Sequence, residues 1–172
     1  MLRVAKFHKV SIGEFLKGFK DAFPFYKEEE IYNIYDKIML PKRATAKSAG
    51  YDFFSPFTFT LKSGETIMIP TGIRVEMNED YVLCLYPRSG LGFKYRLQLN
   101  NTVGIIDSDY FDSDNEGHIF AKITNASNEE KVLKVEEGTG FMQGIFMQYG
   151  ITVDDEVTAI RNGGFGSTTN KE

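Results

Sequence analysis

Residues 100–110 read "NNTVGIIDSDY", and this stretch decides which fold we expect for the chain. Val103, Ile105 and Ile106 favour a half-buried strand, because β-branched apolar residues dominate the run. Asp107 follows with no turn signal before it. A carboxylate at the end of an apolar strand is costly unless something compensates for its desolvation. We therefore treat Asp107 as the first candidate for a functional residue.

The same β-type pattern extends on both sides of this stretch. From residue 39 onward, short apolar runs alternate with turn signals that are rich in glycine, asparagine and aspartate. Short runs at this spacing, with no helices between them, are typical of an antiparallel sandwich or barrel. A first strand is expected within residues 1–10. The later strands are expected in "FTFTL", "ETIMIPTGIRVEM", "YVLCLY", "LQLNNTVGII", "GHIFAKITN" and "FMQGIFMQY".

Residues 11–38 have a helical pattern instead. Ser11 followed by Glu14 is a capping-box signature, and Pro24 ends the apolar periodicity that begins there. A second helical face follows the acidic run at residues 28–30. We predict a small helical insertion, with its two apolar faces formed by Ile12, Phe15, Leu16, Phe19, Phe23 and by Ile31, Ile34, Tyr35, Ile38.

Composition restricts the class of protein. The chain has 172 residues and a net charge of −4, so we expect one domain over residues 1–160 and no nucleic-acid partner. No apolar run reaches the length of a membrane span, and the first residues carry too much charge for a secretory signal. Cys84 is the single cysteine, which rules out an internal disulfide. These features lead us to expect a cytoplasmic protein with no membrane partner.

Five polar or glycine-rich stretches interrupt the β-pattern. They are "AGYDFFSP" (49–56), "YPRSGLG" (86–92), "NNTVGIIDSDY" (100–110), "EEGTGFMQGIF" (136–146) and "RNGGFGSTT" (161–169). "PRSG" suits an anion cradle, because it offers a guanidinium, a hydroxyl and exposed backbone N–H groups, but it also suits a plain surface turn. Phe165, flanked by glycines, suits either a flap that stacks on a planar ligand or a disordered end. We interpret residues 161–172 as a flexible C-terminal arm.

In order and content, these five stretches resemble the five motifs of the trimeric dUTPases (dUTP diphosphatases). The resemblance covers residues 39–169, and the string "GIIDSDY" is its most specific part. It implies a mainly β protein, a β-barrel with distorted jelly-roll topology that carries a small helical insertion near the N-terminus. It also implies a homotrimer with shared active sites. The expected reaction is hydrolysis of dUTP to dUMP and pyrophosphate, which keeps uracil out of DNA and supplies dUMP for thymidylate synthesis.

The resemblance also implies roles for individual residues. Asp107 would orient and deprotonate the water that attacks the α-phosphorus, and Tyr110 would pack under the deoxyribose and exclude a 2′-hydroxyl. Asp52 would hold water ligands of a Mg²⁺ ion that the triphosphate chelates. The other implied substrate-binding residues are Arg88, Ser89, Gly90 and Gln143 at the phosphates, Asn101, Gly104 and Ile106 at the uracil, and Arg161, Phe165, Gly166, Ser167 and Thr168 closing over the nucleotide.

The chain departs from the family pattern at two places after the fold-deciding stretch. Thr139 and Gly140 stand where the fourth motif usually carries an Asp-Arg pair, so an ion pair there is absent. The third motif is followed by extra residues, "FDSDNE" (111–116), whose acidic side chains we interpret as a solvated face. His118 has no metal partners nearby in the sequence, so we expect it to be structural. Cys84 lies inside an apolar run and is expected in the core.

Two alternative functions remain open. A dCTP deaminase shares the architecture, but such enzymes carry a catalytic glutamate where Asp107 stands. A regulatory protein of this fold would act by binding a partner protein through the insertion. If the insertion is merely an accessory, deleting residues 13–37 should spare hydrolysis.

Overall fold

The computed structural model of the chain describes residues 2–161 and residue 163. Strands dominate this part of the chain, and three short α-helices and one 3-10 helix accompany them. The strands are β1 (Ala5–Lys9), β2 (Lys42–Arg43), β3 (Tyr51–Phe54), β4 (Phe59–Leu61), β5 (Thr66–Pro70), β6 (Ile73–Met77), β7 (Tyr81–Pro87), β8 (Leu97–Leu99), β9 (Gly104–Ile106), β10 (Phe120–Asn125), β11 (Leu133–Val135) and β12 (Gly140–Gln148). The helices are α1 (Ile12–Ala22), α2 (Glu28–Asp36), α3 (Ser89–Tyr95) and the 3-10 helix η1 (Ser108–Asp112).

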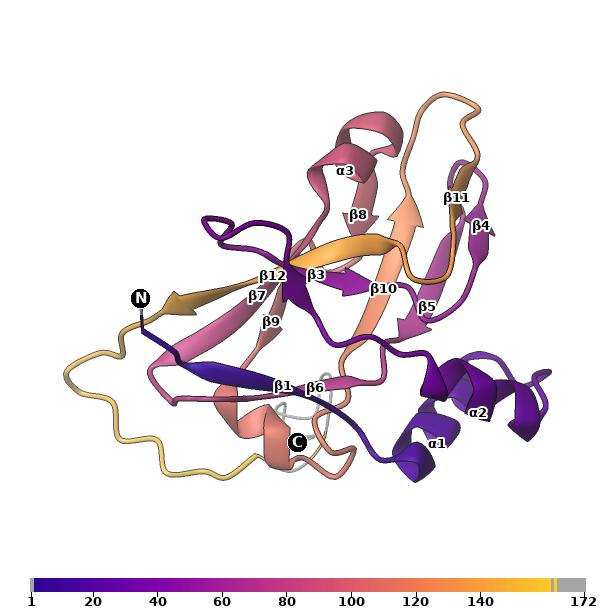
Figure 1. Ribbon diagram of the computed structural model, residues 1–172. Helices are drawn as coiled ribbons and strands as arrows, with labels where there is room; N and C mark the ends of the chain where they lie inside the picture. Colours follow the sequence, from indigo (N-terminus) through magenta and orange to yellow (C-terminus); the bar gives the residue numbers. More distant parts are fainter. Residues whose placement is uncertain (1, 162, 164–172) are drawn as a thin grey trace, which may run out of the picture.

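The strands form antiparallel sheets that surround one core. The largest sheet has the order β2-β3-β12-β7-β9, and a second has the order β5-β10-β8. Two further pairs, β1-β6 and β11-β4, complete the β-structure. Figure 1 shows α1 and α2 together at one side of the molecule, with α3 and η1 at opposite ends of the main sheet. The predicted mainly β, antiparallel fold is confirmed.

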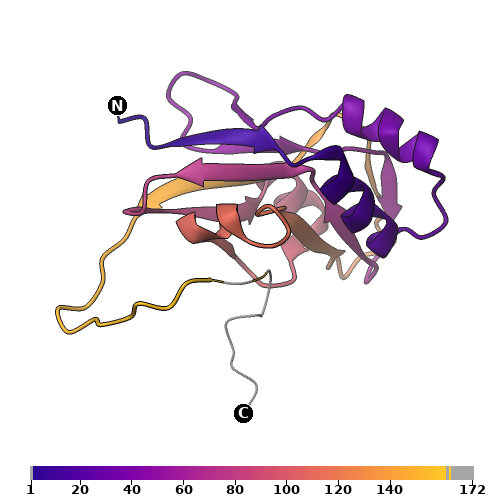
Figure 2. The same ribbon diagram turned by 90° about the horizontal axis from the view of Figure 1, so that it is seen from below.

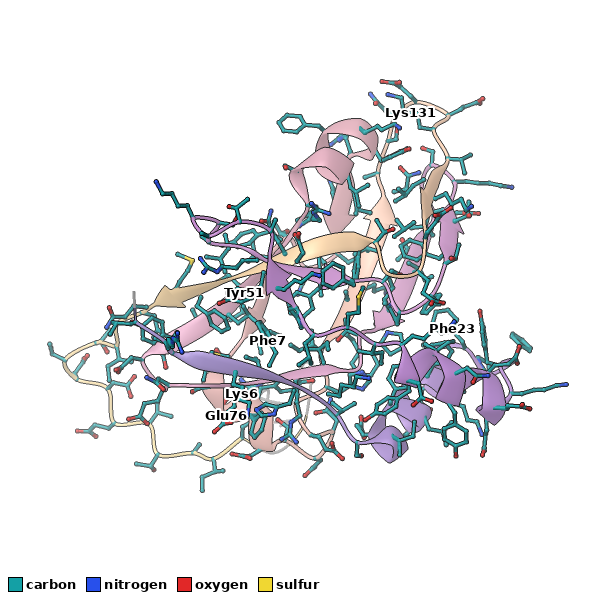
Figure 3. The ribbon with its side chains drawn as sticks, viewed as in Figure 1. Lys6, Phe7, Phe23, Tyr51, Glu76 and Lys131 are labelled. Atoms are coloured by element: carbon teal, nitrogen blue, oxygen red, sulfur yellow. The ribbon has the colours of Figure 1, made fainter. Side chains whose placement is uncertain are left out.

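The β1-β6 pair is anchored to the main sheet by aromatic side chains. The ring centroids of Phe7 and Tyr51 are 5.4 Å apart, and Phe53 meets Phe7 edge-on at 5.6 Å. Lys6 and Glu76 are direct cross-strand neighbours on the outer, exposed side of the pair. Figure 3 shows this alternation, with Phe7 directed toward Tyr51 and Lys6 beside Glu76. The period-2 geometry of a strand thus separates its apolar and charged residues.

Two long runs that we expected to be single strands are each divided. Residues 65–77 break at Gly72, whose φ of +70° belongs to the left-handed region, and β5 and β6 lie on either side. Residues 97–106 break at a turn that includes Thr102, with a φ of +68°, between β8 and β9. Periodicity cannot detect such breaks, because the residues on both sides are apolar.

The expectation of no helices between the strands was wrong. Helix α3 occupies the place of a predicted turn, and η1 directly follows the fold-deciding stretch. Two glycines in α3 lower its intrinsic helix propensity, which hides the helix from a sequence pattern.

The helical insertion is confirmed and belongs to the core. Phe15, Phe19 and Ile31 are completely buried, and the Phe19 ring lies 5.5 Å from that of Phe57 on the β-structure. Figure 2 shows α1 and α2 lying against the sheets. Deleting residues 13–37 would therefore expose the core, and we no longer expect such a deletion to leave the fold intact.

His118 lies beneath the insertion and is completely buried. Its Nε2 accepts a hydrogen bond from the Gly72 N–H at 3.0 Å, so Nδ1 carries the ring proton and lies 3.6 Å from Glu14 Oε1. Burial lowers the pKa of His118 to about 3 and is also the main cause that raises the pKa of Glu14. His118 is thus a neutral residue of the core, in agreement with the expected structural role.

Replacing Phe19 by alanine should lower the free energy of unfolding by about 3 to 5 kcal/mol, because a completely buried aromatic side chain leaves a cavity. Phe25 is the matched control, since it belongs to the same insertion but is 94% exposed. Phe25→Ala should change stability by at most about 0.5 kcal/mol. Urea denaturation of the two variants measures both effects. Equal effects would contradict the packing of α1 into the core.

Stability should depend on pH through His118. The unfolded chain protonates this residue near pH 6.5, whereas the folded protein does so only near pH 3. The stability that neutral His118 contributes is therefore present above pH 6.5 and is lost as pH falls toward 3, by at most roughly 1.4 kcal/mol per pH unit.

Denaturation at pH 7, 6 and 5 measures this slope. Glu14 works in the opposite sense, because its raised pKa makes the folded state take up a proton at low pH. The test therefore compares the slope of stability against pH in the wild type with the slope in His118→Gln. The substitution should make this slope smaller. His8→Gln is the control, because His8 is partly exposed. A slope that His118→Gln leaves unchanged would refute the assignment.

Candidate active site

The predicted site residues that the structure describes gather at three places around β7 and β9. One group lies where β7 ends and is called the Arg88 cluster. A second lies where β9 ends and is called the Asp107 cluster. A pocket lies between β9 and β10. The Arg88 cluster consists of Asp52, Arg88, Gly140 and Gln143, and the Asp107 cluster consists of Asp107, Asp109, Tyr110 and Arg161.

An ion pair forms the centre of the Arg88 cluster. Arg88 Nε lies 3.2 Å from Asp52 Oδ1, and Arg88 Nη1 donates to the Gly140 carbonyl at 3.4 Å. The Asp52 side chain is only 16% exposed, whereas that of Arg88 is 42% exposed and can reach a ligand. Gln143 is the direct neighbour of Asp52 across the β3-β12 pair, and its Nε2 donates to the Pro87 carbonyl at 3.3 Å. Three neighbouring strands thus hold these side chains together.

Gly140 allows Arg88 to take this position. A Cβ atom at residue 140 would lie 2.8 Å from Arg88 Nη1 and 3.2 Å from its Cδ. The side chain that the family usually carries there would therefore displace Arg88. Our sequence reasoning noted the substitution but not this consequence, which depends on the proximity of β12 and the end of β7.

Ser89 and Gly90 form the exposed first turn of α3 directly after Arg88. The N–H groups in the first turn of a helix have no acceptor within it, so they can bind an anion. Nothing within 4 Å would meet a Cβ atom at Gly90, and the backbone there is therefore open to a ligand.

Asp107 lies between the last residue of β9 and the first residue of η1. Its extended backbone, with φ −78° and ψ 158°, makes it the residue that precedes the 3-10 helix, and its side chain is 48% exposed. Arg161 bridges two carboxylates: its Nη2 donates to Asp107 Oδ2, and its Nε donates to Asp109 Oδ1 at 2.9 Å. The Arg161 guanidinium also lies 5.7 Å from the centre of the Tyr110 ring. Asp109 was not among the residues that the sequence suggested.

The orientation of Tyr110 is set by hydrogen bonds at its hydroxyl group. The hydroxyl donates to the His118 carbonyl at 2.7 Å and accepts from Asn115 Nδ2 at 2.8 Å. Burial is the main cause that raises the pKa of Tyr110, although the Asn115 hydrogen bond lowers it. The side chain is therefore a neutral, fixed ring. Sequence reasoning missed Asn115, which lies in the loop that we interpreted as solvated.

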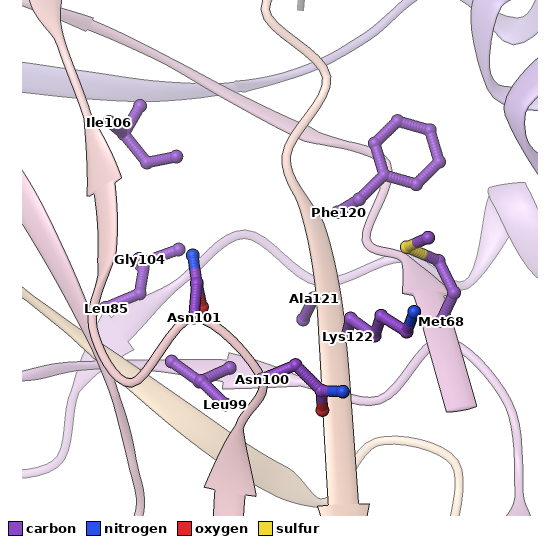
Figure 4. Close-up of a pocket in the computed structure, with 10 residues that line it drawn as sticks. All are labelled: Met68, Leu85, Leu99, Asn100, Asn101, Gly104, Ile106, Phe120, Ala121 and Lys122. Atoms are coloured by element: carbon purple, nitrogen blue, oxygen red, sulfur yellow. The ribbon is translucent and has the colours of Figure 1, made fainter. Parts of the chain in front are cut away.

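A pocket of about 340 Å³ opens between β9 and β10, next to the turn that joins β8 to β9. Figure 4 shows Gly104 and Ile106 on one wall and Phe120, Ala121 and Lys122 on the other. β8 and β9 are each the last strand of their sheet, and within the described chain they do not pair with one another. Backbone N–H and C=O groups on such edges can bind a planar ring with hydrogen-bonding edges. The full lining is Met68, Leu85, Leu99, Asn100, Asn101, Gly104, Ile106, Phe120, Ala121 and Lys122, which includes three of the predicted residues.

The two charged clusters lie far apart within one chain. The register pairs Leu83 with Ile106, which places Asp107 beside Val82 in the antiparallel β7-β9 pair. Arg88 lies six residues farther along β7, a separation of about 20 Å at the rise of an extended strand. The described part of one chain therefore does not bring the expected base and the expected phosphate ligands together.

Some residues that the sequence predicted for the site are not among those that the structure describes. Phe165, Gly166, Ser167 and Thr168 lie outside the described residues. Among the described residues, no group of three or more His, Cys, Asp or Glu side chains could hold a metal ion. None of the helices in that part of the chain is both long and apolar enough to cross a bilayer.

The chain is similar in sequence and fold to known dUTPases. The dUTPase family model matches residues 36–169. A deoxyuridine 5′-triphosphate nucleotidohydrolase of Lactococcus lactis is 43% identical over 134 residues, which are 76% of this chain and 88% of that protein. The crystal structure of a dUTPase from Streptococcus mutans superposes with a TM-score of 0.61 at 31% identity and covers 85% of this chain and 97% of that one.

A mutant dUTPase from phage phi11 of S. aureus has the same fold. It superposes with a TM-score of 0.61 at 19% identity and covers 91% of this chain and 98% of its own, and its structure is described as revealing the coordination of a structural Mg(II) ion. Given the family match over most of its length and the identity to curated relatives, the chain belongs to the dUTPase family.

Proposed function

We propose that this chain hydrolyses dUTP to dUMP and pyrophosphate by attack of water on the α-phosphorus. The observation that carries the proposal is the position of Asp107. It directly follows Ile106, which lines the pocket between β9 and β10, and its half-exposed side chain lines a second hollow together with Ser108 and Asp109. The reaction would keep uracil out of DNA and supply dUMP for thymidylate synthesis. The names of the curated relatives support the same reaction.

The pocket between β9 and β10 is the proposed uracil site. The outer edge of β9, together with the Asn101 amide, offers donors and acceptors to the edge of a pyrimidine. Gly104 and Ile106 line the wall on the β9 side. Tyr110 follows four residues after Ile106, so the sugar of a base bound here would lie toward its fixed ring, where a 2′-hydroxyl would be excluded.

Asp107 is the proposed general base. It would hold the attacking water and accept its proton, because a carboxylate held on a rigid strand end can be aligned with the reacting phosphorus. In the structure, Arg161 binds this carboxylate and that of Asp109, and a bound triphosphate would offer Arg161 a further anion. A nucleophilic route is not supported, since Cys84 is buried in the sheet.

The Arg88 cluster is the proposed phosphate site. Arg88, with the first turn of α3, would bind phosphate oxygens, and Gln143 would assist at the α- and β-phosphates. Asp52 suits an outer ligand of Mg²⁺, because this ion takes few protein carboxylates and keeps waters and substrate phosphates as ligands. When bound, Mg²⁺ would neutralise charge on the triphosphate. Arg88 and Asp52, now paired with each other, would then each have a new partner.

We further propose a homotrimer whose active sites combine residues from different chains. The separation of about 20 Å between the clusters supports this, because one chain would supply Asp107 and another would supply Arg88. The segment before Arg161 also carries strongly exposed apolar side chains that a second chain could cover, namely Ile151, Val153, Val157 and Ile160. The arm of residues 161–172, with Phe165, Gly166, Ser167 and Thr168, would close over the nucleotide.

The two alternative functions are less well supported. A deaminase would need its catalytic glutamate where Asp107 stands. A regulatory role would require a protein partner, for which the exposed aromatic residues Phe25 and Tyr32 of the insertion offer a surface. We retain such a partner, and a cytoplasmic location, as proposals that accompany dUTP hydrolysis.

Asp107→Asn should reduce turnover of dUTP by about 10² to 10⁴, because asparagine keeps the shape but cannot accept the proton. Nucleotide binding should survive. Asp109→Asn is the matched control, since Asp109 also binds Arg161, and it should retain more than about a tenth of the activity. Pyrophosphate release and equilibrium binding of a non-hydrolysable dUTP analogue measure the two properties. Near-normal turnover by Asp107→Asn would disprove the assignment of the base.

Shared active sites predict complementation between two inactive variants. Asp107→Asn and Arg88→Ala should each be nearly inactive alone. Co-expressed with different affinity tags and purified through both, they should recover activity at roughly a third of the sites, because every mixed trimer joins an intact Asp107 to an intact Arg88 at one of its three sites. If each site used one chain only, mixing would restore nothing. The mixture of Asp107→Asn with Asp52→Ala is expected to behave in the same way.

A further inference from the structure

The helical insertion and the loop after η1 contact each other through one carboxylate. Glu116 accepts a hydrogen bond from the Ser11 backbone N–H at 2.7 Å and another from the Ser11 hydroxyl at 2.6 Å. Ser11 is the N-cap of α1, and its hydroxyl in turn accepts from the Glu14 N–H at 3.2 Å. The capping box expected from the sequence is thus completed by Glu116, 105 residues away, instead of by Glu14. Glu116, which we interpreted as part of a solvated face, is 34% exposed and is also anchored to the start of α1.

The same carboxylate is connected to η1 through Arg74. Arg74 Nη1 lies 3.9 Å from Glu116, and the guanidinium carbon lies 3.6 Å from the centre of the Phe111 ring. Arg74 Nη2 also donates to the Phe111 carbonyl. Because Phe111 is part of η1, these contacts form a continuous path from the start of α1 to the 3-10 helix that follows Asp107.

The loop around Glu116 also surrounds Tyr110. Asn115 and His118, on either side of Glu116, form the two hydrogen bonds to the Tyr110 hydroxyl. At Gly117, a Cβ atom would lie 2.6 Å from the Tyr110 carbonyl oxygen, so the backbone passes directly against this residue. Glu116 itself has a φ of +56°, a conformation that is sterically unfavourable for any residue with a Cβ atom. Its hydrogen bonds to Ser11 hold it there.

We propose that Glu116 is a positioning residue that couples the helical insertion to η1 and thereby fixes Tyr110 and Asp107 for catalysis. This inference rests on the proposed roles of Tyr110 and Asp107. Glu116 touches neither the pocket nor the charged clusters, so it acts only through the loop that it anchors. The helical insertion and residues 111–116, the extra residues after the third motif, are therefore joined into one unit.

The coupling has a specific consequence for sugar selection. A ring that excludes a 2′-hydroxyl by contact must be held within a fraction of an ångström, and a misplacement of about 1 Å can cost 10²-fold in rate. Loosening the loop should therefore reduce discrimination between dUTP and UTP. A purely structural contact would lower the melting temperature without changing this preference.

Glu116→Gln is the first test. The glutamine retains the size of the side chain, but its amide nitrogen cannot accept the second hydrogen bond from Ser11, and it has no charge to attract Arg74. We expect the ratio of kcat/KM for dUTP to kcat/KM for UTP to fall about tenfold. The kinetics are measured at a temperature well below the melting temperature of the variant. Steady-state kinetics with both nucleotides and a melting curve are measured on the same preparation.

Glu30→Gln is the matched control. Glu30 accepts from the Lys27 N–H at 2.8 Å and so caps α2 in the same insertion, through a bond of the same type. This variant should lower the melting temperature to a similar extent but leave the dUTP-to-UTP ratio unchanged. If Glu116→Gln does not fold, Ser11→Ala removes one of the two hydrogen bonds and should shift the ratio in the same direction by a smaller factor.

Two outcomes would overturn the proposal. An unchanged ratio in Glu116→Gln, or in Ser11→Ala where that variant replaces it, would show that the contact serves stability alone. An equal change in Glu30→Gln would show that any loosening of the insertion has this effect. Failure of the proposed function is distinguishable, because it would appear as activity retained in Asp107→Asn whatever Glu116→Gln does.

Discussion

The register of β7 between β12 and β9 is the constraint on which the rest of the structure depends. β7 is paired along its whole length with β12, and Leu83 and Leu85 point into the core. Because side chains alternate between the faces of a strand, a slip of one residue would turn both leucines outward. The same register places Asp107 at one end of β7 and Arg88 at the other. This separation is the observation that supports the proposed sharing of one active site by two chains.

The charged side chains at both ends of β7 already form ion pairs within the chain. Arg88 binds Asp52, and Arg161 bridges Asp107 and Asp109. An unpaired charge in a partly buried position is costly, so these pairs stabilise side chains to which we assign roles in the proposed reaction. A triphosphate with its cation offers each of them a partner of the right sign. Binding can therefore exchange one set of ion pairs for another without leaving a bare charge in the site.

The insertion illustrates how an addition to a fold becomes part of it. Gly72 has the left-handed conformation that only glycine adopts readily, and a Cβ atom there would clash with Ile38 of the insertion. The barrel thus leaves space for the helices at the break between β5 and β6. Glu116 then links the first helix to the segment that carries Tyr110. The insertion is thus packed against the core and is also linked to the loop that holds Tyr110.

Much of the protein could be predicted from the sequence. Alternating apolar runs indicated the antiparallel strands, the Ser11 and Pro24 signals delimited a helical region, and the five motifs indicated the family, because these are local patterns. Other features were decided only by the tertiary structure. The breaks at Gly72 and Thr102, the partnership of Glu116 with Ser11, the space that Gly140 leaves for Arg88, and the distance between Arg88 and Asp107 all involve residues far apart in the chain or a backbone conformation set by packing. Local periodicity contains no information about such contacts, since they exist only once the strands have paired.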